Sequence, residues 1–238
     1  TNHVVIWKPL TVIAADPDPR NTVIEGRVRI QPPMGLPVFT QMVRCVYVAE
    51  GATLIGFTLT NGHHRGQGGA VFGEAGGALS NCIITGSSAV YGGGMFGGKA
   101  YHCQFVGNVS TNWGGGLYGG EAESCVFAEN SNEQSGGGGA AESTLRNCVL
   151  YRNRAWAGGA AYNCRAENCT ISRNEANIYG AVHFGSYVNC IIYDNLWSGN
   201  FDPYYGEFVH CLSDPVPPGT NNLSADPQFA NPDAGDFR

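Results

Sequence analysis

The side chains best suited to acid–base chemistry gather between residues 63 and 74. His63, His64 and Arg65 are consecutive, and Glu74 follows a glycine-rich stretch. Imidazoles and a carboxylate can exchange protons or bind a metal ion near neutral pH. No third metal ligand stands at a suitable spacing, and a solvated loop accounts for the same residues. Two interpretations therefore stay open for this segment: the catalytic site of a polysaccharide-degrading enzyme, and a surface loop.

Other candidate ligands for a metal ion are acidic. Asp16 and Asp18 alternate with prolines and could offer carboxylates to calcium, although a Pro-rich turn explains the pattern more simply. The chain has no CxxC motif, and no His stands at ligand spacing from the pair Cys164 and Cys169. A second acidic group near the C-terminal end consists of Asp202, Glu207 and Asp214. We predict no metal or other cofactor, with calcium as the alternative.

Aromatic residues give a different kind of candidate site. Tyr91, Trp113 and Trp156 precede glycine clusters, and Tyr118 and Phe96 fall in a second position after those clusters. Exposed columns of such rings would form flat platforms for sugar rings, with nearby Asn and His side chains as hydrogen-bond partners. Rings that face inward would only close the coil by packing against the glycines. The predicted ligand-binding residues are Tyr91, Trp113, Tyr118 and Trp156.

A repeat of 21 to 23 residues must position all of these side chains. Seven cysteines mark it, at intervals of 21, 22, 23, 21, 21 and 21 residues. They are Cys82, Cys103, Cys125, Cys148, Cys169, Cys190 and Cys211. A fixed period of this length indicates a stack of one structural unit.

The residues around each cysteine predict one coil of a parallel β-helix. Cys and the large apolar residue two positions later share one face of a strand, because side chains alternate along β structure. An asparagine follows five residues after five of the cysteines, and a glycine cluster comes next. These asparagines are Asn108, Asn130, Asn153, Asn174 and Asn195. Stacked coils would turn them into a ladder of hydrogen-bonded amides.

The cysteines themselves are predicted to be buried thiols. The chain has nine, so at least one cannot pair internally. Neighbouring coils would place stacked Cα atoms within the range that disulfides accept, so distance alone does not forbid bridges. Regular inward placement still favours a ladder of thiols that act as small hydrophobic groups.

Most charged residues of the repeats fall opposite a charge of the other sign on the next coil. Such cross-strand pairs mainly fix register, which explains these residues without catalysis. The predicted pairs are Lys99 with Glu121, Glu129 with Arg152, Arg154 with Glu175 and Arg173 with Asp194, together with the triad Glu123, Arg146 and Glu167.

Composition indicates a single elongated all-β domain. Only 13% of the 238 residues are charged, and 35 are glycine. We assign residues 1–200 to the β-helix and 201–238 to an irregular cap and tail. The net charge of −6 disfavours nucleic acid and anionic membranes as partners, and no apolar run is long enough to span a membrane. The abrupt ends of the chain lead us to expect a longer precursor.

Several segments resemble a known group of proteins. They are Val43 to Tyr47, Gly51 to Gly62, the repeated Asn-Cys-x-Ile and Tyr-Gly-Gly-Gly blocks, and the ending Ala225 to Phe229 with Gly235 to Arg238. Together they resemble secreted bacterial right-handed parallel β-helix repeat proteins of the pectate-lyase-like superfamily. Units such as Phe105 to Asn108 are also similar to polymorphic outer-membrane adhesin repeats. The resemblance implies a right-handed β-helix that is secreted or displayed on a bacterial surface.

The resemblance does not select one activity. The superfamily includes polysaccharide lyases, glycoside hydrolases, epimerases and non-catalytic adhesins. Its lyases place acidic calcium ligands on adjacent coils beside an Arg or Lys base, and its hydrolases use clustered Asp pairs. Here the charged residues on adjacent coils alternate in sign instead. We therefore predict a non-catalytic binding or structural module for extracellular glycans, with a lyase or hydrolase and a passive spacer as the alternatives.

Overall fold

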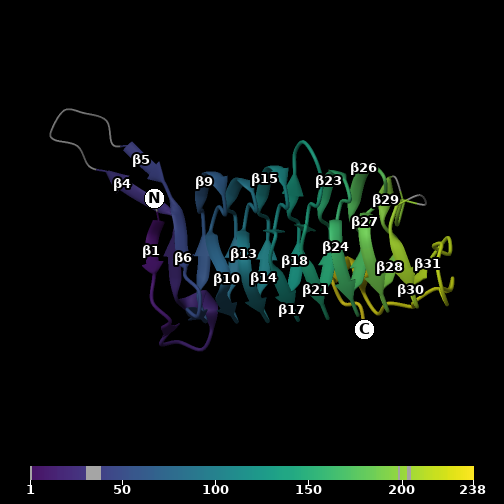
Figure 1. Cartoon of the computed structure of the whole chain (residues 1–238), viewed down its shortest axis with the longest axis horizontal. Helices are drawn as coiled ribbons and strands as arrows, with labels where there is room; N and C mark the ends of the chain where they lie inside the picture. The colour runs from purple at the N-terminus through teal and green to yellow at the C-terminus, as the bar shows by residue number, and fades with distance from the viewer. Residues whose placement is uncertain (1, 31–38, 198, 203–204) are drawn as a thin grey trace.

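The chain winds into a stack of parallel coils, as the cysteine spacing predicts. The computed structural model describes residues 2–30, 39–197, 199–202 and 205–238. It is a right-handed β-solenoid of about seven turns, which confirms the predicted fold class (Figure 1). Three parallel sheets run along the solenoid, and an antiparallel hairpin of β4 (Arg27–Ile30) and β5 (Phe39–Met42) projects at its N-terminal end.

The strands of each coil are distributed over the three sheets. The first sheet holds β1 (Asn2–Ile6), β2 (Thr11–Ile13), β6 (Arg44–Val48), β7 (Thr53–Ile55), β10 (Val71–Ser80), β13 (Met95–Tyr101), β16 (Leu117–Tyr118), β17 (Glu121–Glu123), β20 (Ala140–Ala141), β21 (Thr144–Arg146), β24 (Ala161–Glu167), β27 (Val182–Val188) and β30 (Glu207–Val209). The second sheet holds β3 (Val23–Glu25), β8 (Thr58–Thr60), β11 (Ile83–Thr85), β14 (Gln104–Val106), β18 (Val126–Ala128), β22 (Val149–Tyr151), β25 (Thr170–Ser172), β28 (Ile191–Tyr193) and β31 (Leu212–Ser213). The third sheet holds β9 (His63–Gln67), β12 (Ser88–Tyr91), β15 (Val109–Trp113), β19 (Ser131–Asn132), β23 (Arg154–Ala157), β26 (Glu175–Ile178) and β29 (Leu196–Trp197).

The bends between sheets explain two features of the repeat. The residue before each of the seven cysteines has a positive φ, between 49° and 55°, and asparagine is among the few residues that adopt this conformation readily. One glycine of each cluster forms another bend with positive φ: Gly92, Gly114, Gly137, Gly158 and Gly180. At Gly92, with φ of +62°, an added Cβ would lie 2.1 Å from the Met95 carbonyl oxygen, so only glycine fits.

The predicted asparagine ladder is present and buried. The Nδ2 of Asn108 donates to Oδ1 of Asn130 at 3.0 Å, and the same bond links Asn130 to Asn153 and Asn153 to Asn174 at 3.0 and 2.9 Å. Each Oδ1 also accepts the backbone N–H of the asparagine one coil below, at 3.0 Å for Asn108 and Asn130. Two amide bonds per coil therefore fix the register at this corner.

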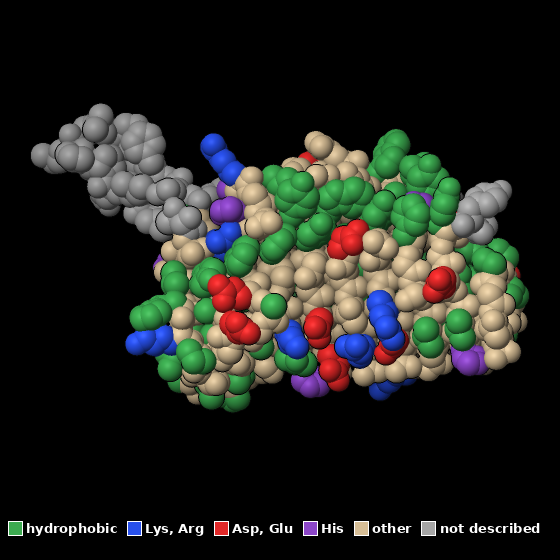
Figure 2. Space-filling model, in the orientation of Figure 1, with side chains coloured by type: hydrophobic (Ala, Val, Ile, Leu, Met, Phe, Trp, Pro, Cys, Tyr) green, Lys and Arg blue, Asp and Glu red, His purple; other side chains and the backbone are tan. Residues whose placement is uncertain are grey.

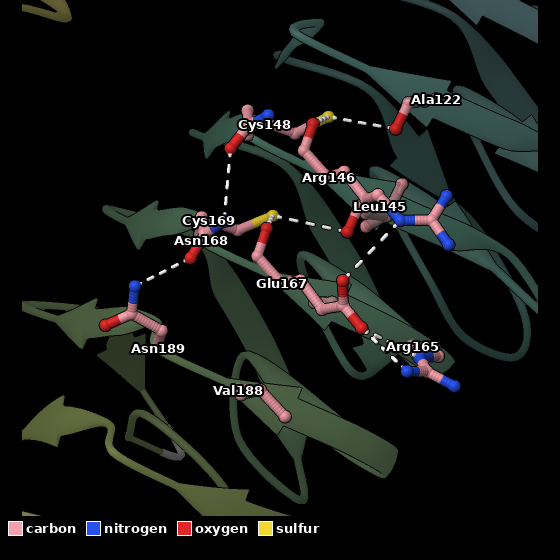
Figure 3. Close-up of polar contacts among 12 residues, drawn as sticks. Ala122, Leu145, Arg146, Cys148, Arg165, Glu167, Asn168, Cys169, Val188 and Asn189 are labelled. Carbon is pink, nitrogen blue, oxygen red and sulfur yellow. Dashed lines mark hydrogen bonds and ion pairs between the residues drawn. The ribbon is translucent and has the colours of Figure 1, made fainter.

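The predicted thiol ladder is present as well. All nine cysteines are buried and free. The strands that follow the seven repeat cysteines pair in register from β11 to β31, so the cysteines form one column. The Cys148 and Cys169 side chains project in the same direction from adjacent coils (Figure 3). Outside the column, burial raises the pKa of Cys45 and Cys164 to about 12, so these thiols stay protonated at neutral pH.

The charge pairs lie on the surface where the register places them. The ion pairs are Lys99–Glu121 at 3.7 Å, Arg146–Glu167 at 3.5 Å, Arg152–Glu129 at 3.9 Å, Arg154–Glu175 at 3.8 Å and Arg173–Asp194 at 2.9 Å. Glu123 pairs with Arg146 along the strands, and Arg165 joins Glu167 at 2.7 Å (Figure 3). Because these side chains are solvent-exposed, their main effect is on register rather than on stability.

The C-terminal segment covers the last coil and then folds back. Parallel pairing continues past residue 200 through β30 and β31, and the backbone bridges Val209–Thr220 and Leu212–Leu223 close this end. The tail then returns along the second sheet, where Phe237 packs on Tyr151 and η2 (Pro232–Ala234) supplies Asp233. The Asp233 carboxylate lies 3.3 Å from the Arg173 guanidinium.

Candidate functional site

The outward face of the third sheet carries a row of polar side chains. Side chains alternate along each strand, so Ala89, Ser110, Asn132, Ala155 and Ala176 point inward and are buried. Their neighbours point outward and follow one another from coil to coil: His63, Ser88, Val109, Ser131, Arg154 and Glu175. The segment His63–Arg65 lies within β9, so the predicted loop is wrong here. The reason is that residues 63 and 64 pair with Ser88 and Ala89 of β12.

Two hollows lie end to end along this face. The first, of about 460 Å³, is lined by the apolar residues Ala89, Val90 and Val109 together with His63, His64, Arg65, Ser88, Thr111 and Glu133. The second, of about 310 Å³, is lined by Ser131, Asn132, Glu133, Arg154, Ala155, Trp156 and Asn177. Glu133 belongs to both hollows. We call this continuous feature, from β9 to β26, the polar groove.

The far end of the polar groove presents an indole ring. Trp156 is 49% exposed and stands beside Asn177 and the Arg154–Glu175 ion pair. From β9 to β23 the groove crosses four coil steps, which span about 19 Å at about 4.8 Å per step. An exposed aromatic ring beside amide, hydroxyl and guanidinium groups can stack on a sugar ring while hydrogen-bonding its hydroxyls.

At the histidine end of the groove, both imidazoles make local hydrogen-bonding contacts. The Nδ1 of His63 lies 2.8 Å from the Ser88 hydroxyl, and the Nδ1 of His64 accepts the Gly66 N–H at 3.1 Å. Burial lowers the pKa of His64, and the positive charge of Arg44 lowers it further. At neutral pH His64 is therefore uncharged.

Glu74 does not join the histidines. It lies on β10 in the first sheet, where its carboxylate accepts a hydrogen bond from the Tyr47 hydroxyl and another from the Glu50 N–H at 2.8 Å. The bond from Tyr47 is the main reason that the pKa of Glu74 is lowered. The four candidate catalytic residues are therefore split between two faces of the solenoid.

Aromatic side chains form a second surface feature, which we call the aromatic ridge. Tyr47, Phe72, Phe96 and Tyr118 stack on consecutive coils of the first sheet, with ring centroids 5.4 to 5.7 Å apart and interplanar angles of 6° to 21°. Figure 2 shows hydrophobic side chains in a band along the upper part of this face, above the charged residues. Each ring within the stack covers the face of the next, so the ridge offers few free faces for a sugar.

The remaining predicted aromatic residues divide between the ridge and the groove. Tyr91 packs on Tyr118 at 5.5 Å, and Trp113 packs on Tyr162 at 4.4 Å. Trp156 is not in the column of Tyr91 and Trp113, because Gly136 and Ala157 continue that column. Since Trp156 precedes Ala157 by one residue, its side chain points to the opposite side of the strand, into the polar groove.

Sequence reasoning missed a buried imidazole–carboxylate pair near the end of the ridge. The Nδ1 of His183 lies 3.0 Å from Oδ2 of Asp202, and their side chains are only 5% and 2% exposed. His183 stacks on Tyr179 at 4.5 Å and contacts Phe184 at 4.1 Å. The sequence feature that could have drawn attention to His183 is its position one repeat after Tyr162, which places it in the column of the ridge residues.

The predicted acidic group near the C-terminal end does not form. Asp202 is buried against His183, whereas Glu207 is exposed on β30. Asp214 accepts a hydrogen bond from the Ser224 hydroxyl at 3.1 Å. The three carboxylates therefore belong to three separate environments.

A pH dependence of stability follows from the burial of His183. Burial lowers its pKa more than Asp202 raises it, so the folded value lies below the unfolded value of about 6.5. Between the two values the unfolded chain binds more protons, and the free energy of unfolding falls as the pH drops through about 6.5. We expect the melting temperature to decrease from pH 7.5 to pH 5 by more in the native protein than in His183→Gln. Equal decreases in both would contradict this assignment, and exposed His210→Gln is the control.

Asp16 and Asp18 are engaged in a local turn. Asp18 caps η1 (Pro19–Asn21) and binds the Arg20 guanidinium, which lowers the pKa of Asp18 to about 2. Asp16 accepts the N–H of Asp18 at 2.9 Å and the Asn21 amide at 3.0 Å. Across the described residues, no group of three or more His, Cys, Asp or Glu side chains could hold a metal ion.

Comparisons of the chain with protein-family models, curated proteins and solved structures found no match. The resemblance to the pectate-lyase-like superfamily therefore stays a prediction beyond the solenoid fold itself. Within the described ranges, no helix is both long and apolar enough to cross a membrane.

Proposed function

We propose that this protein is a non-catalytic glycan-binding module that holds a saccharide chain in the polar groove. The observation that carries the proposal is the half-exposed indole of Trp156 in the hollow where the groove is lined mainly by polar side chains. The stretch of about 19 Å from β9 to β23 suits an extended chain of several sugar rings rather than a compact ligand. As the repeat resemblance implies, we place the protein outside a bacterial cell, secreted or on the surface.

The arrangement of charges favours binding over cleavage. Glycoside hydrolysis by the common route requires two carboxyl groups that face each other across the scissile bond. Of the two glutamates along the groove, Glu175 is paired with Arg154, and Glu133 lies at the junction of the hollows. A lyase would need a base beside calcium ligands, and the carboxylates at the groove are not grouped in this way among the described residues.

The aromatic ridge is a less suitable sugar site than the groove. Its rings already use their faces to stack on each other, and neighbouring rings are separated by about one coil step. Tyr91, Trp113 and Tyr118 therefore act mainly as packing residues in this proposal, whereas Trp156 contacts the ligand.

The test is a screen of extracellular polysaccharides followed by titration of an oligosaccharide that binds. Trp156→Ala should raise its dissociation constant about tenfold, which corresponds to loss of about 1.4 kcal/mol of stacking. The matched control is Trp7→Ala, because Trp7 is 68% exposed on the N-terminal coil, several coils away from Trp156.

Three results would overturn the proposal. Equal weakening by Trp7→Ala would place the ligand elsewhere. Calcium-dependent release of unsaturated products would favour the lyase alternative. Failure to bind any saccharide in the screen would favour a passive spacer.

A further inference from the structure

The first hollow of the polar groove has an apolar floor. Val90 and Val109 lie on adjacent coils, are half-buried, and both line this hollow. Their side chains cannot hydrogen-bond to a sugar hydroxyl. The second hollow, around Trp156, is lined mainly by polar side chains. A ligand that fills both hollows therefore needs an apolar group at one point and hydrogen-bonding groups elsewhere.

A hydroxyl and a carboxylate stand beside this floor. Thr111 follows Val109 by two residues on β15, so their side chains project on the same outward face, and the buried Ser110 lies between them. The Glu133 N–H donates to the Ser110 carbonyl at 3.0 Å, which places Glu133 beside Thr111 on the next coil. Thr111 and Glu133 both line the first hollow.

Glu133 begins a bulge that separates the two hollows. Five positions lie between Ser131 and its successor Gly136 in the pairing, whereas their partners Arg154 and Ala157 are only three positions apart. The coil that carries Glu133 therefore has extra residues at this point, which bend the strand and redirect its side chains. This position explains why Glu133 lines both hollows.

The buried Asn132 side chain fixes the bulge. Its Oδ1 accepts the Ser135 N–H at 2.6 Å, and its Nδ2 donates to the Ser110 hydroxyl at 2.8 Å. Among the residues that the structure describes, the Glu133 carboxylate has no hydrogen bond or ion pair of its own. An anchored strand thus presents an acceptor without an internal partner at the junction of the hollows.

An acetamido group matches all three features of the first hollow. Its methyl group suits the valine floor, its N–H can donate to the Glu133 carboxylate, and its carbonyl can accept from the Thr111 hydroxyl. A sugar hydroxyl would leave the floor facing a polar group, and the methyl group of a deoxy sugar would offer the carboxylate no donor. The hydrogen bond to the carboxylate is charge-assisted and therefore strong.

We infer that the polar groove recognises saccharides built from 2-acetamido sugars, an inference that rests on the proposed glycan-binding function. One acetamido group lies over Val109 between Thr111 and Glu133, and a sugar ring stacks on Trp156. Strands β15 and β23 are two coil steps apart, about 10 Å, so these two groups belong to adjacent sugars of one chain.

The experiment compares three β-1,4-linked tetrasaccharides that differ only at C2: those of N-acetylglucosamine, glucose and glucosamine. Their dissociation constants for the native protein are measured by calorimetry. The acetylated tetramer should bind about tenfold more tightly than the glucose tetramer, because it adds methyl burial and an N–H donor. It should also bind more tightly than the glucosamine tetramer, whose ammonium groups leave the valine floor uncovered.

Variants show which residues produce this preference. Glu133→Ala should reduce it to about threefold or less, and Glu133→Gln should keep more of it, because the glutamine amide oxygen still accepts a hydrogen bond. Trp156→Ala should weaken the acetylated and glucose tetramers by the same factor and leave the preference unchanged. The matched control is Glu207→Ala, which removes an exposed carboxylate from the first sheet and should alter neither quantity. Circular dichroism checks that each variant is folded.

The outcomes separate this inference from the proposed function. Equal binding of the acetylated and glucose tetramers, both weakened by Trp156→Ala, would overturn the acetamido site and leave the glycan-binding function intact. Tightest binding of the glucosamine tetramer would overturn it in favour of an ion pair between ammonium and Glu133. A preference that persists in Glu133→Ala would also overturn it. If none of the three tetramers binds, the acetamido site is wrong, and the polysaccharide screen decides the glycan-binding function separately.

Discussion

Gly115→Ala is expected to prevent folding or to lower the free energy of unfolding by about 4 kcal/mol or more. A Cβ at this position would lie 2.3 Å from the Gly138 carbonyl oxygen and 2.5 Å from the Ser131 carbonyl oxygen. Both atoms belong to the backbone of the next coil, which cannot move without opening the stack. Chemical denaturation followed by circular dichroism measures the loss.

The control for this variant is Gly107→Ala. Gly107 also lies in the repeats and has φ of +62°, but an added Cβ would have no atom within 4 Å. We expect a loss of about 1–2 kcal/mol, which is the cost of a left-handed conformation for alanine. Equal losses in the two variants would show that the close contact between coils at the glycine clusters does not determine the free energy of unfolding.

Asn130→Ala is the second substitution for which we expect a large effect, with a loss of about 3 kcal/mol. The Asn130 Oδ1 accepts both the N–H and the Nδ2 of Asn108, and its Nδ2 donates to the Phe105 carbonyl at 2.8 Å. Alanine would remove these three buried hydrogen bonds, and the Nδ2 of Asn108 would keep only its bond to the Ile84 carbonyl. Thermal and urea unfolding should both show the loss, because the ladder is continuous across the stack.

The matched control is Asn168→Ala. Asn168 also stacks on asparagines of adjacent coils, Asn147 and Asn189, but its amide is in an exposed hydrogen-bonded column. Its φ is +55°, so alanine should cost about 1 kcal/mol through backbone conformation alone. A loss at Asn130 no larger than that at Asn168 would contradict the role assigned to the inner ladder.

The stacked architecture explains why much of the fold could be predicted. In a parallel solenoid, residues one repeat apart become neighbours in space, so spacing in the chain translates directly into contacts. Asn130 and Asn153, or Arg173 and Asp194, were paired correctly for this reason. The cysteine column followed from the same rule.

The candidate site could be predicted only in part. An alignment error of one residue assigns a side chain to the wrong side of its strand. Trp156 was aligned on its glycine cluster, but the structure aligns Ala157 with Trp113 through Gly136. A shift of one residue moves a side chain to the other side of a strand. The pairing of β12 with β9 and β15 also shifts between Ala89 and Tyr91, which the repeat period does not reveal.

The His183–Asp202 pair was missed for a different reason. Asp202 lies in the irregular segment after the last asparagine of the ladder, where the period no longer relates positions in the chain to positions in space. The carboxylate reaches back to the preceding coil, and only the folded backbone shows that contact.

The most direct test of the proposed function observes the indole N–H signals of the four tryptophans by nuclear magnetic resonance. Each signal is assigned by a Trp→Phe variant, and an oligosaccharide that binds is then titrated. We predict that the Trp156 signal shifts with the ligand while the Trp113 and Trp7 signals stay in place. A shift of the Trp113 signal with the Trp156 signal unchanged would contradict the account and place the ligand on the aromatic ridge.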